Sequence, residues 1–463
     1  MLSYVCPNQT KGVSDSDSIQ RAVRLAAENG TRCVLIPKYN ERTGENVWKI
    51  DQTVRLPSDM TIILDDCLLV LEDDVYSGFF CSENLLTESG TRLSARMHGI
   101  SIIGRGNATL DGGKPNDLSE KTEKRLGIPI VVNSPIVLLN VEGFEVSSLS
   151  IINQRYWGMR FEYCSNGSVR NIFFNVKRDR FNQDGINLRN GCHNIVIENI
   201  RGQTGDDMIA LSAIDTEELC PALIVRGHDS DIHDVLIRNV SGAAIRHPLV
   251  ALRNHNGAKM YNITIDGIRD TEKIAPVEAD DFERYALITL GVNSYALKSP
   301  AAPGDTYGIS ISNVEAFHSV RAIRIQSVLS DSTIRNVRAG GVCRSVISTG
   351  PDGWAKAPSG AVIDGLALSN VSFHPSDTAR AALLDFGIMR EGDSVRDFVI
   401  ASVELDQTIP LCRLDECVRD FECHLDGILL ETIERVPHRE KMATPLEAPY
   451  WLVNGKATHE SEM

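Results

Sequence analysis

Short runs of alternating apolar and polar residues recur along most of the chain, each next to an asparagine or glycine. In each run the apolar residues occupy every second position, which is typical of a β-strand with one buried face. The clearest runs span residues 99–104, 144–151, 167–172, 194–200, 234–240, 261–268, 308–314, 332–337 and 361–366. From Leu149 to Ile172 is 23 residues and from Ile172 to Ile197 is 25, so the repeat has a period in the twenties.

A period of this length, combined with strand alternation, predicts a solenoid in which each coil buries its inner face against its neighbours. Leucine-rich repeats share the period, but the chain lacks their LxxLxL signature. A β-sandwich would need strands about every 8–12 residues with hairpin turns, and Asn-Gly hairpin turns are scarce here. The pattern therefore favours an all-β fold, a right-handed parallel β-helix. Stacked residues at the coil corners would satisfy the turn backbone, and the candidates are Cys164, Asn171, Cys192, Asn199 and Asn239.

The chain ends differ from the repeats, as a solenoid requires, because an uncovered coil exposes unpaired strand edges. Residues 14–17 predict the cap of a helix over residues 18–29, which Gly30 ends. Its apolar face would close the N-terminal end of the core, with Ile19, Ala22, Val23, Leu25 and Ala26. Since no Gly/Ser-rich or Pro-rich linker is present, we predict a single β-helix domain over residues 1–463. It would have an N-terminal cap at 1–35, coils over about 50–405, and a C-terminal cap and tail at 406–463.

Composition and charge limit the classes of molecule that the protein is expected to bind. Hydrophobic residues make up 42% of the 463 residues and charged residues 24%, which is typical of a soluble globular protein. The formal net charge of −15 would repel nucleic acid and anionic membranes. The eleven cysteines follow no zinc spacing, and the first residues lack a basic-then-apolar signal, so we expect reduced thiols and a cytoplasmic location. No P-loop or strand-linked GxGxxG is present, and we expect no metal or other cofactor.

Three aspartates are the strongest candidates for chemistry. Asp184 lies in an Asn-x-Asp-Gly motif, and Asp206 and Asp207 follow 22 residues later in Gly-Asp-Asp, about one coil further on. Coils stacked in register would place Asp184 and Asp206 one above the other on adjacent strands, about 4.8 Å apart. Crowded carboxylates raise the pKa of at least one member, and a protonated acid beside an ionised base is what glycosidic cleavage needs. The alternative is that Gly-Asp-Asp is only a solvated turn.

These motifs resemble glycoside hydrolase family 28, the polygalacturonase-like enzymes of the pectin-degrading β-helix group. The resemblance covers about residues 10–270, through the segments 12–20, 34–37, 102–106, 110–113 and 153–158, and is densest at 182–186 and 205–210. It implies Asp206 as the general acid, with Asp184 and Asp207 positioning and deprotonating water, and inversion at the anomeric carbon. A close stacked pair of carboxylates would on separation alone suggest retention. Calcium is a second interpretation of clustered acids, as in pectate lyases, but the motif order does not fit that class.

The resemblance also implies substrate-binding residues. The family carries Gly-His-Gly one coil beyond the acid pair, and here Gly227-His228-Asp229 lacks the second glycine. His228 is therefore either an active-site histidine or an exposed turn residue. Two coils beyond the acids, Arg253 matches the family's Arg-x-Lys while His255 replaces the lysine. Because a neutral imidazole is a weak partner for a carboxylate, we expect the sugar at the cleavage site to be neutral or modified.

Three further residues are considered for the substrate-binding site. Asn182 opens the first aspartate motif and is expected to contact substrate. Trp157, beside Tyr156, could stack on a sugar or belong to the core. His247, next to Pro248, is interpreted as a loop histidine.

The sequence thus predicts a cytoplasmic glycoside hydrolase acting on short, plant-type oligosaccharides, pectin-related or neutral, with an oligomer possible. Residues 115–124 are a candidate for the loop that walls off one end of an exo-acting cleft, although an ordinary solvated loop fits equally well. Two rival interpretations stay open. One is another carbohydrate-active β-helix enzyme, such as a lyase, an epimerase or a glycosyl transferase. The other is a non-catalytic carbohydrate-binding β-helix.

Overall fold

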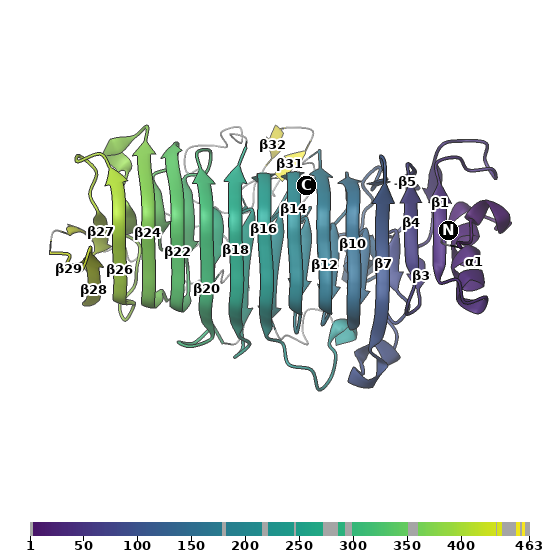
Figure 1. Ribbon diagram of the computed structural model, residues 1–463, viewed down its shortest axis with the longest axis horizontal. Coiled ribbons are helices and arrows are strands. Elements are labelled where there is room, and N and C mark those ends of the chain that lie inside the picture. The colour runs from purple at the N-terminus through teal and green to yellow at the C-terminus, as the bar shows by residue number, and fades with distance from the viewer. Residues whose placement is uncertain are drawn as a thin grey trace. The chain divides into compact units, whose positions relative to one another are not determined.

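The computed structural model describes residues 3–177, 182–214, 221–244, 247–271, 286–291, 299–350, 360–431 and 433–437, and two strands at 451–453 and 456–458. Contacts group the chain into two units. Unit 1 comprises Met1–Gly205 and Thr216–Ser230, and unit 2 comprises Asp206–Asp215 and Asp231–Met463. Each unit is built from coils of parallel strands, and the chain has the predicted fold, a right-handed parallel β-helix (Figure 1). Whether it forms one domain stays a prediction.

Unit 1 contains two sets of parallel strands. The strands of the first set are β1 (Cys33–Pro37), β2 (Trp48–Ile50), β4 (Thr61–Asp65), β5 (Leu68–Leu71), β7 (Met97–Arg105), β8 (Thr109–Asp111), β10 (Val141–Ile152), β12 (Ser165–Asn175) and β14 (His193–Thr204). Those of the second set are β3 (Val54–Leu56), β6 (Phe80–Ser82), β9 (Ile136–Leu139), β11 (Met159–Glu162) and β13 (Ile186–Arg189). Neighbours such as β10 and β12 pair in parallel, as coils of a solenoid do.

Unit 2 repeats this plan. Its first set comprises β16 (Ile232–Ala244), β18 (Met260–Asp270), β20 (Thr306–Ala316), β22 (Val328–Gly341), β24 (Val362–Pro375), β26 (Ser394–Leu405), β28 (Asp420–Leu425) and β29 (Ile428–Leu429). Its second set comprises β15 (Ile209–Ile214), β17 (Val250–His255), β19 (Ala286–Leu290), β21 (Arg321–Ile325), β23 (Ser345–Ser348), β25 (Leu384–Phe386), β27 (Cys412–Asp415) and β30 (Glu434–Val436). A separate antiparallel pair is formed by β31 (Trp451–Val453) and β32 (Lys456–Thr458). Parallel pairing thus includes β1, β27 and β30, which lie outside the predicted 50–405 range.

The long strands of the first set contain a corner residue with a left-handed backbone, which in most of them is asparagine. Ser148, Asn171 and Asn199 occupy the middle of β10, β12 and β14 with φ of 60°, 57° and 58°. Asparagine tolerates this left-handed conformation better than most residues. The Asn199 side chain donates to Asn171 Oδ1 at 3.0 Å, and the Cys164 backbone N donates to Cys192 Sγ at 3.4 Å. The predicted ladders are therefore confirmed at these positions.

The predicted coil register is right in one place and wrong in another. Leu149 pairs with Ile172, 23 residues on, as expected. Ile172 pairs with Ile200 and not with Ile197, whose partner is Val169. The coil is three residues longer than expected because the connection between β12 and β14 takes up extra residues while the buried face keeps its alignment.

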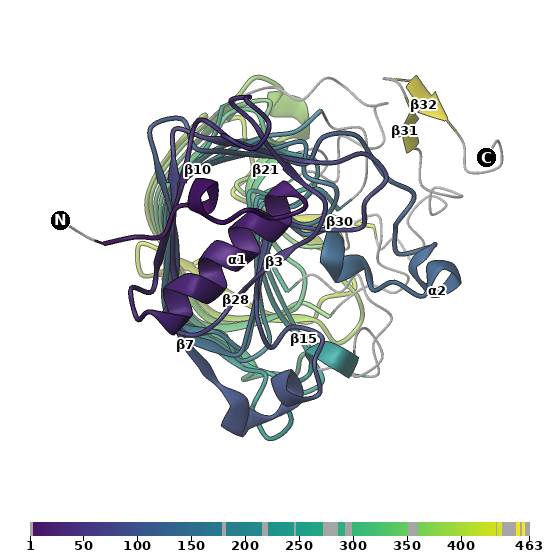
Figure 2. The ribbon, with the colours of Figure 1, turned by 90° about the vertical axis from the view of Figure 1, so that its right-hand side faces the viewer.

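The N-terminal helix closes the coils of unit 1. Helix α1 (Asp15–Glu28) begins three residues before the predicted start, because the Ser14 side chain accepts from Asp17 N at 3.2 Å. It contacts β1, β2 and β3 and lies across the end of these coils (Figure 2). Leu25 departs from the predicted face, since it is 41% exposed. Gly30, with φ 77°, follows the helix as expected.

The remaining helices are short. They are α2 (Glu123–Leu126) and the 3₁₀ turns Pro7–Gln9, Ser89–Thr91, Leu93–Ala95, Ile130–Asn133, Pro221–Leu223 and Thr378–Arg380. None of the described helices has the length and apolar character that crossing a membrane demands. In the described part of the chain every cysteine is a free thiol.

Candidate active site

Two adjacent aspartates stand where the chain enters β15 in unit 2. Asp206 is 9% exposed and Asp207 is completely buried. The Asp207 backbone N donates to Asp206 Oδ1 at 2.8 Å, which turns the Asp206 carboxyl toward the start of its own strand. Two acids are thereby fixed side by side with unequal access to solvent.

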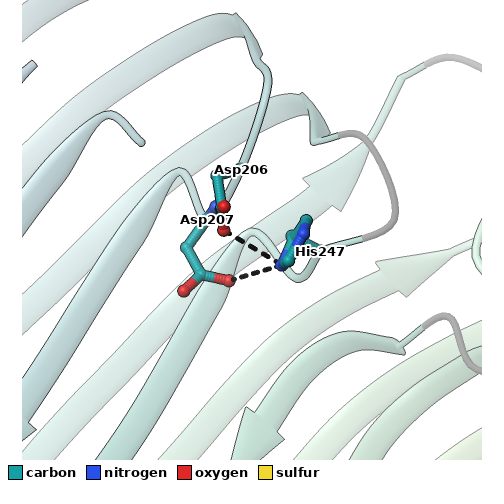
Figure 3. A group of neighbouring side chains, drawn as sticks. All are labelled: Asp206, Asp207 and His247. Atoms are coloured by element: carbon teal, nitrogen blue, oxygen red, sulfur yellow. Dashed lines mark hydrogen bonds and ion pairs between the residues drawn. The ribbon is translucent and has the colours of Figure 1, made fainter. Parts of the chain in front are cut away.

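A histidine from the next coil faces both carboxyl groups. His247 Nδ1 lies 3.0 Å from Asp206 Oδ1 and 3.8 Å from Asp207 Oδ1, and its side chain is 21% exposed (Figure 3). The Met208 backbone N donates to the Pro248 carbonyl at 3.3 Å, which holds the two entering segments together. Interpreting His247 as a loop histidine missed this contact.

A signal for His247 was present in the strand alignment. Because Ile209 of β15 pairs with Val250 of β17, His247 occupies the position in its coil that Asp206 occupies in the preceding one. Stacked coils bring equivalent positions about 4.8 Å apart. Aligning the apolar runs that follow each residue would have found the pair.

Arg253 holds the second aspartate. It lies in β17, where it is the register partner of Ser212 in the adjacent strand β15. Its guanidinium donates to Asp207 Oδ2. Arg253 is itself only 9% exposed, so this is a buried ion pair. The guanidinium that was expected to grip a sugar group therefore binds Asp207, and its role in substrate binding stays a prediction.

The surroundings of the two aspartates shift their pKa values in opposite directions. Burial raises the pKa of Asp206, but the attraction and hydrogen bond of His247 outweigh it, so the pKa falls below its ordinary value. Burial raises the pKa of Asp207, and Arg253 only partly offsets burial and the neighbouring Asp206 charge. Burial lowers the pKa of His247, yet attraction to Asp206 and Asp207 raises it overall. The cluster thus favours an ionised Asp206 beside a protonated His247 in mildly acidic solution, with Asp207 more easily protonated than a free aspartate.

This arrangement can hold one transferable proton next to a fixed carboxylate, which is the requirement of general acid–base chemistry. The donor atoms of Asp206, Asp207 and His247 also lie within 4.8 Å of one another, a spacing that a metal ion could bridge. The Arg253 guanidinium on Asp207 already supplies a positive charge there and would repel a cation. The donor set therefore suits proton transfer better than metal binding.

The first aspartate motif lies in unit 1. Asp184 is 2% exposed, and its Oδ2 accepts from Asn187 Nδ2 at 3.2 Å. Asn182 has a left-handed backbone with φ 53°. The stacking of Asp184 over Asp206 and the contact of Asn182 with substrate stay predictions.

His228, also in unit 1, is held by neighbours. Its Nε2 lies 3.2 Å from an Arg96 nitrogen, its Nδ1 lies 2.8 Å from the Asp229 carbonyl, and its ring packs on Tyr163. The side chain is 9% exposed, so the expectation of an exposed turn residue is wrong. Burial lowers its pKa, which favours a neutral ring. Its place in an active site remains a prediction.

Two other candidates are buried. Trp157 is 7% exposed, stacks on Tyr156 with ring centroids 5.1 Å apart, and carries the Arg160 guanidinium 4.7 Å from its ring centre. His255 follows Arg253 in β17 on the same side of the strand and is 2% exposed. Binding of a sugar by either residue stays a prediction.

The segment 115–124 in unit 1 packs over this aromatic pair. Leu118 joins Tyr156 and Trp157 in one apolar cluster, and Tyr156 Oη donates to Glu120 Oε1 at 2.8 Å. The segment is thus anchored and not simply solvated. Its role as the wall of an exo site stays a prediction.

Comparison with known proteins gives partial matches. Residues 87–228 match the profile of glycosyl hydrolases family 28, a segment that contains Asp184, Asp206 and Asp207. An exopolygalacturonase of Zea mays is 26% identical over 204 residues, which cover 43% of this chain and 46% of that protein. The match therefore spans less than half the length of this curated relative.

Solved structures support the fold. The family 28 exopolygalacturonase of Yersinia enterocolitica superposes with a TM-score of 0.54 at 14% identity, covering 95% of this chain and 77% of that chain. A tailspike protein mutant of E. coli bacteriophage HK620, in complex with a pentasaccharide, gives 0.61 at 13% identity, covering 94% of this chain and 78% of that chain. At such identities the likeness concerns the fold alone. The predicted resemblance to glycoside hydrolase family 28 is confirmed, and it is carried by residues 87–228.

Proposed function

We propose that this protein is a polygalacturonase-like glycoside hydrolase that cleaves pectin-related or neutral plant oligosaccharides. The observation that carries the proposal is the pair formed by His247 and Asp206, 3.0 Å apart, beside Asp207 and Arg253. One cluster holds both a proton and a fixed carboxylate. Support for a glycosidic substrate comes from the family match of the segment that contains the aspartates.

In the proposed mechanism Asp206 delivers the proton to the leaving oxygen. Before substrate binds, the proton of the pair resides mainly on His247, because the pKa of Asp206 is lowered and that of His247 raised. A bound sugar excludes water, which disfavours the separated charges and moves the proton to Asp206. As the glycosidic bond breaks, the leaving oxygen takes this proton from Asp206. His247 then takes up a new proton from solvent, which returns the pair to its starting state.

The water that attacks the anomeric carbon would be positioned and deprotonated by Asp207 and Asp184. Arg253 fixes the Asp207 carboxyl so that an oxygen stays in place during turnover. Attack from the face opposite the leaving group inverts the configuration. The site would accept short oligosaccharides within the cytoplasm and would release sugars from one chain end.

The proposal is tested by incubating the purified chain with a panel of pectic and neutral oligosaccharides and following the first product by NMR. A new reducing end of inverted configuration is the expected result. An unsaturated product that absorbs in the ultraviolet would identify a lyase. Isomerised sugars without new reducing ends would identify an epimerase, and tight binding without any product would identify a carbohydrate-binding protein. Each of these last three results would overturn the proposal.

A further inference from the structure

A small cavity in unit 2 adjoins His247, the histidine of the acid cluster. Its volume is about 10 Å³, which is close to the least space that one water molecule needs. The wall combines apolar residues, among them Ala244, Leu249 and Ala286, with three polar residues, which are His247, Asp270 and Ser319. A cavity of this size that is partly polar is suited to water and is too small for a sugar unit.

The carboxylate of Asp270 is fixed at the edge of this cavity. Asp270 is 6% exposed and is the register partner of Gly242, which also lines the cavity. Its Oδ1 accepts from Phe317 N at 2.9 Å, and its Oδ2 accepts from His318 N at 2.9 Å and from Ser319 N at 2.7 Å. A carboxylate has about four lone-pair sites. Three backbone donors therefore hold the group in place and leave it able to accept one further bond.

His247 faces the acid cluster through one ring nitrogen only. Both of its contacts, at 3.0 Å to Asp206 and 3.8 Å to Asp207, run from Nδ1 (Figure 3). Among the residues that the structure describes, Nε2 has no hydrogen-bond partner. A protonated imidazole donates from both nitrogens, and a donor that lacks an acceptor costs free energy. A histidine that stores a proton thus needs an acceptor at Nε2.

A single water molecule in the cavity would meet this need. Buried waters typically make about three hydrogen bonds. Here the water can accept from His247 Nε2, donate to the Asp270 carboxylate and bond the hydroxyl of Ser319. The negative charge of a carboxylate beyond the water favours the protonated imidazole over the neutral one.

We propose that the cavity holds one water molecule that links His247 Nε2 to the carboxylate of Asp270, which makes Asp270 a positioning residue for the proton-carrying imidazole. The charged groups that face His247 are then Asp206, Asp207 and Arg253 on the side of the cluster, and Asp270 behind the water. The significance of this contact for catalysis rests on the proposed function, while the water and its partners rest on the cavity alone.

The test follows the His247 ring by NMR in the full chain without substrate, with isotope-labelled histidine and with His247→Gln to assign its signals. The ring should show cross-relaxation to a bound water. Asp270→Asn should lower the pKa of His247 by about one unit, since it removes a nearby negative charge. Ala286→Val fills the cavity without removing any bond of Asp270, and it should abolish the water signal. It decides the result if Asp270→Asn does not fold.

The matched controls are Asp415→Asn and Ala322→Val. Asp415 is also buried and accepts from a backbone nitrogen, that of Cys417, at 3.0 Å. Ala322 is buried in β21, and neither residue belongs to the described wall of the cavity. Both variants should leave the titration and the water signal of His247 unaltered.

The outcome separates this proposal from the proposed function. A His247 ring without a bound water, or a His247 titration that Asp270→Asn leaves unchanged, would overturn the proposal whether or not the protein is a hydrolase. On an identified substrate, Asp270→Asn should also move the decline of activity at alkaline pH to lower pH by the same shift. A purely structural role of Asp270 would not produce that movement.

Discussion

At the scale of single residues, the proposed chemistry depends on the contact between His247 and Asp206. The imidazole both lowers the pKa of Asp206 and stores the proton that Asp206 would deliver. Replacing His247 by Gln should lower kcat by about 10²–10⁴, the range for loss of acid–base assistance. Activity of the unchanged protein should decline as pH rises through the raised pKa of His247. This alkaline limb of the pH–rate profile should disappear in His247→Gln. Rates measured across pH check both expectations.

The control for this variant is His233→Gln. His233 also bonds a neighbouring aspartate, with its Nδ1 2.7 Å from Asp234 Oδ2, but it lies in β16 away from the acid cluster. Its replacement should leave the pH profile unaltered. An alkaline limb that persists in His247→Gln would show that another group sets the profile.

The same pair should also contribute to folding stability over a defined pH range. A raised pKa for His247 gives stability that is complete below its ordinary value of 6.5 and is lost as pH rises through the folded value. A lowered pKa for Asp206 gives stability that is present above 3.8 and is lost as pH falls through the folded value. The difference in unfolding free energy between the unchanged protein and His247→Gln, measured by urea titration, should therefore be largest between pH 3.8 and pH 6.5. A difference that grows steadily toward alkaline pH would argue against the ion pair.

The aspartates of the acid site could be predicted from the sequence, whereas their partners could not. Asp206 and Asp207 stand out because the spacing of the motifs matches one coil. His247 and the Asp207–Arg253 contact could not be read from motifs, because each depends on which residue of the next coil lies opposite. That alignment needs the strand register, which the sequence constrains only through its apolar positions.

At the scale of elements, the corner asparagines are the residues on which the bent strands depend. Asn336 in β22 donates to Asn313 at 3.0 Å, accepts from Asn370 at 3.1 Å, and has φ 57°. Asn336→Ala should lower the unfolding free energy by about 1–2 kcal/mol, because it removes both hydrogen bonds and because alanine tolerates the left-handed conformation less well than asparagine. Asn336→Gly should cost less, since glycine adopts that conformation freely. Equal losses in the two variants, measured by denaturant titration, would show that backbone strain plays no part.

The strands themselves were predictable, while their connections were not. Alternating runs located every strand of the first set from β7 to β24 except β8, because each run has to fill one buried face. The pairing of Ile172 with Ile200 was missed, since connections of a solenoid lengthen without any change in the buried pattern. The start of α1 was placed three residues late because Ser14, and not the residues after it, caps the helix.

At the scale of the whole molecule, the proposed substrate is a short chain processed from one end. Digestion of an oligomer should release single sugars from the earliest times, and the viscosity of an intact polymer should hardly fall. Chromatography of a time course, with viscosity followed in parallel, checks this. Early internal fragments would instead indicate endo cleavage.

The central claim is that Asp206 donates the proton that breaks a glycosidic bond. The most direct measurement is the turnover of a substrate identified in the oligosaccharide panel by the unchanged protein and by Asp206→Asn, with thermal unfolding of both as the check on folding. The neutral amide keeps the shape of the side chain but cannot donate a carboxylic proton. A loss of about 10²–10⁴ in kcat is the predicted result, in a protein that still unfolds cooperatively and loses only the small stability that the His247–Asp206 pair contributes. Full activity of Asp206→Asn on that substrate would contradict the account.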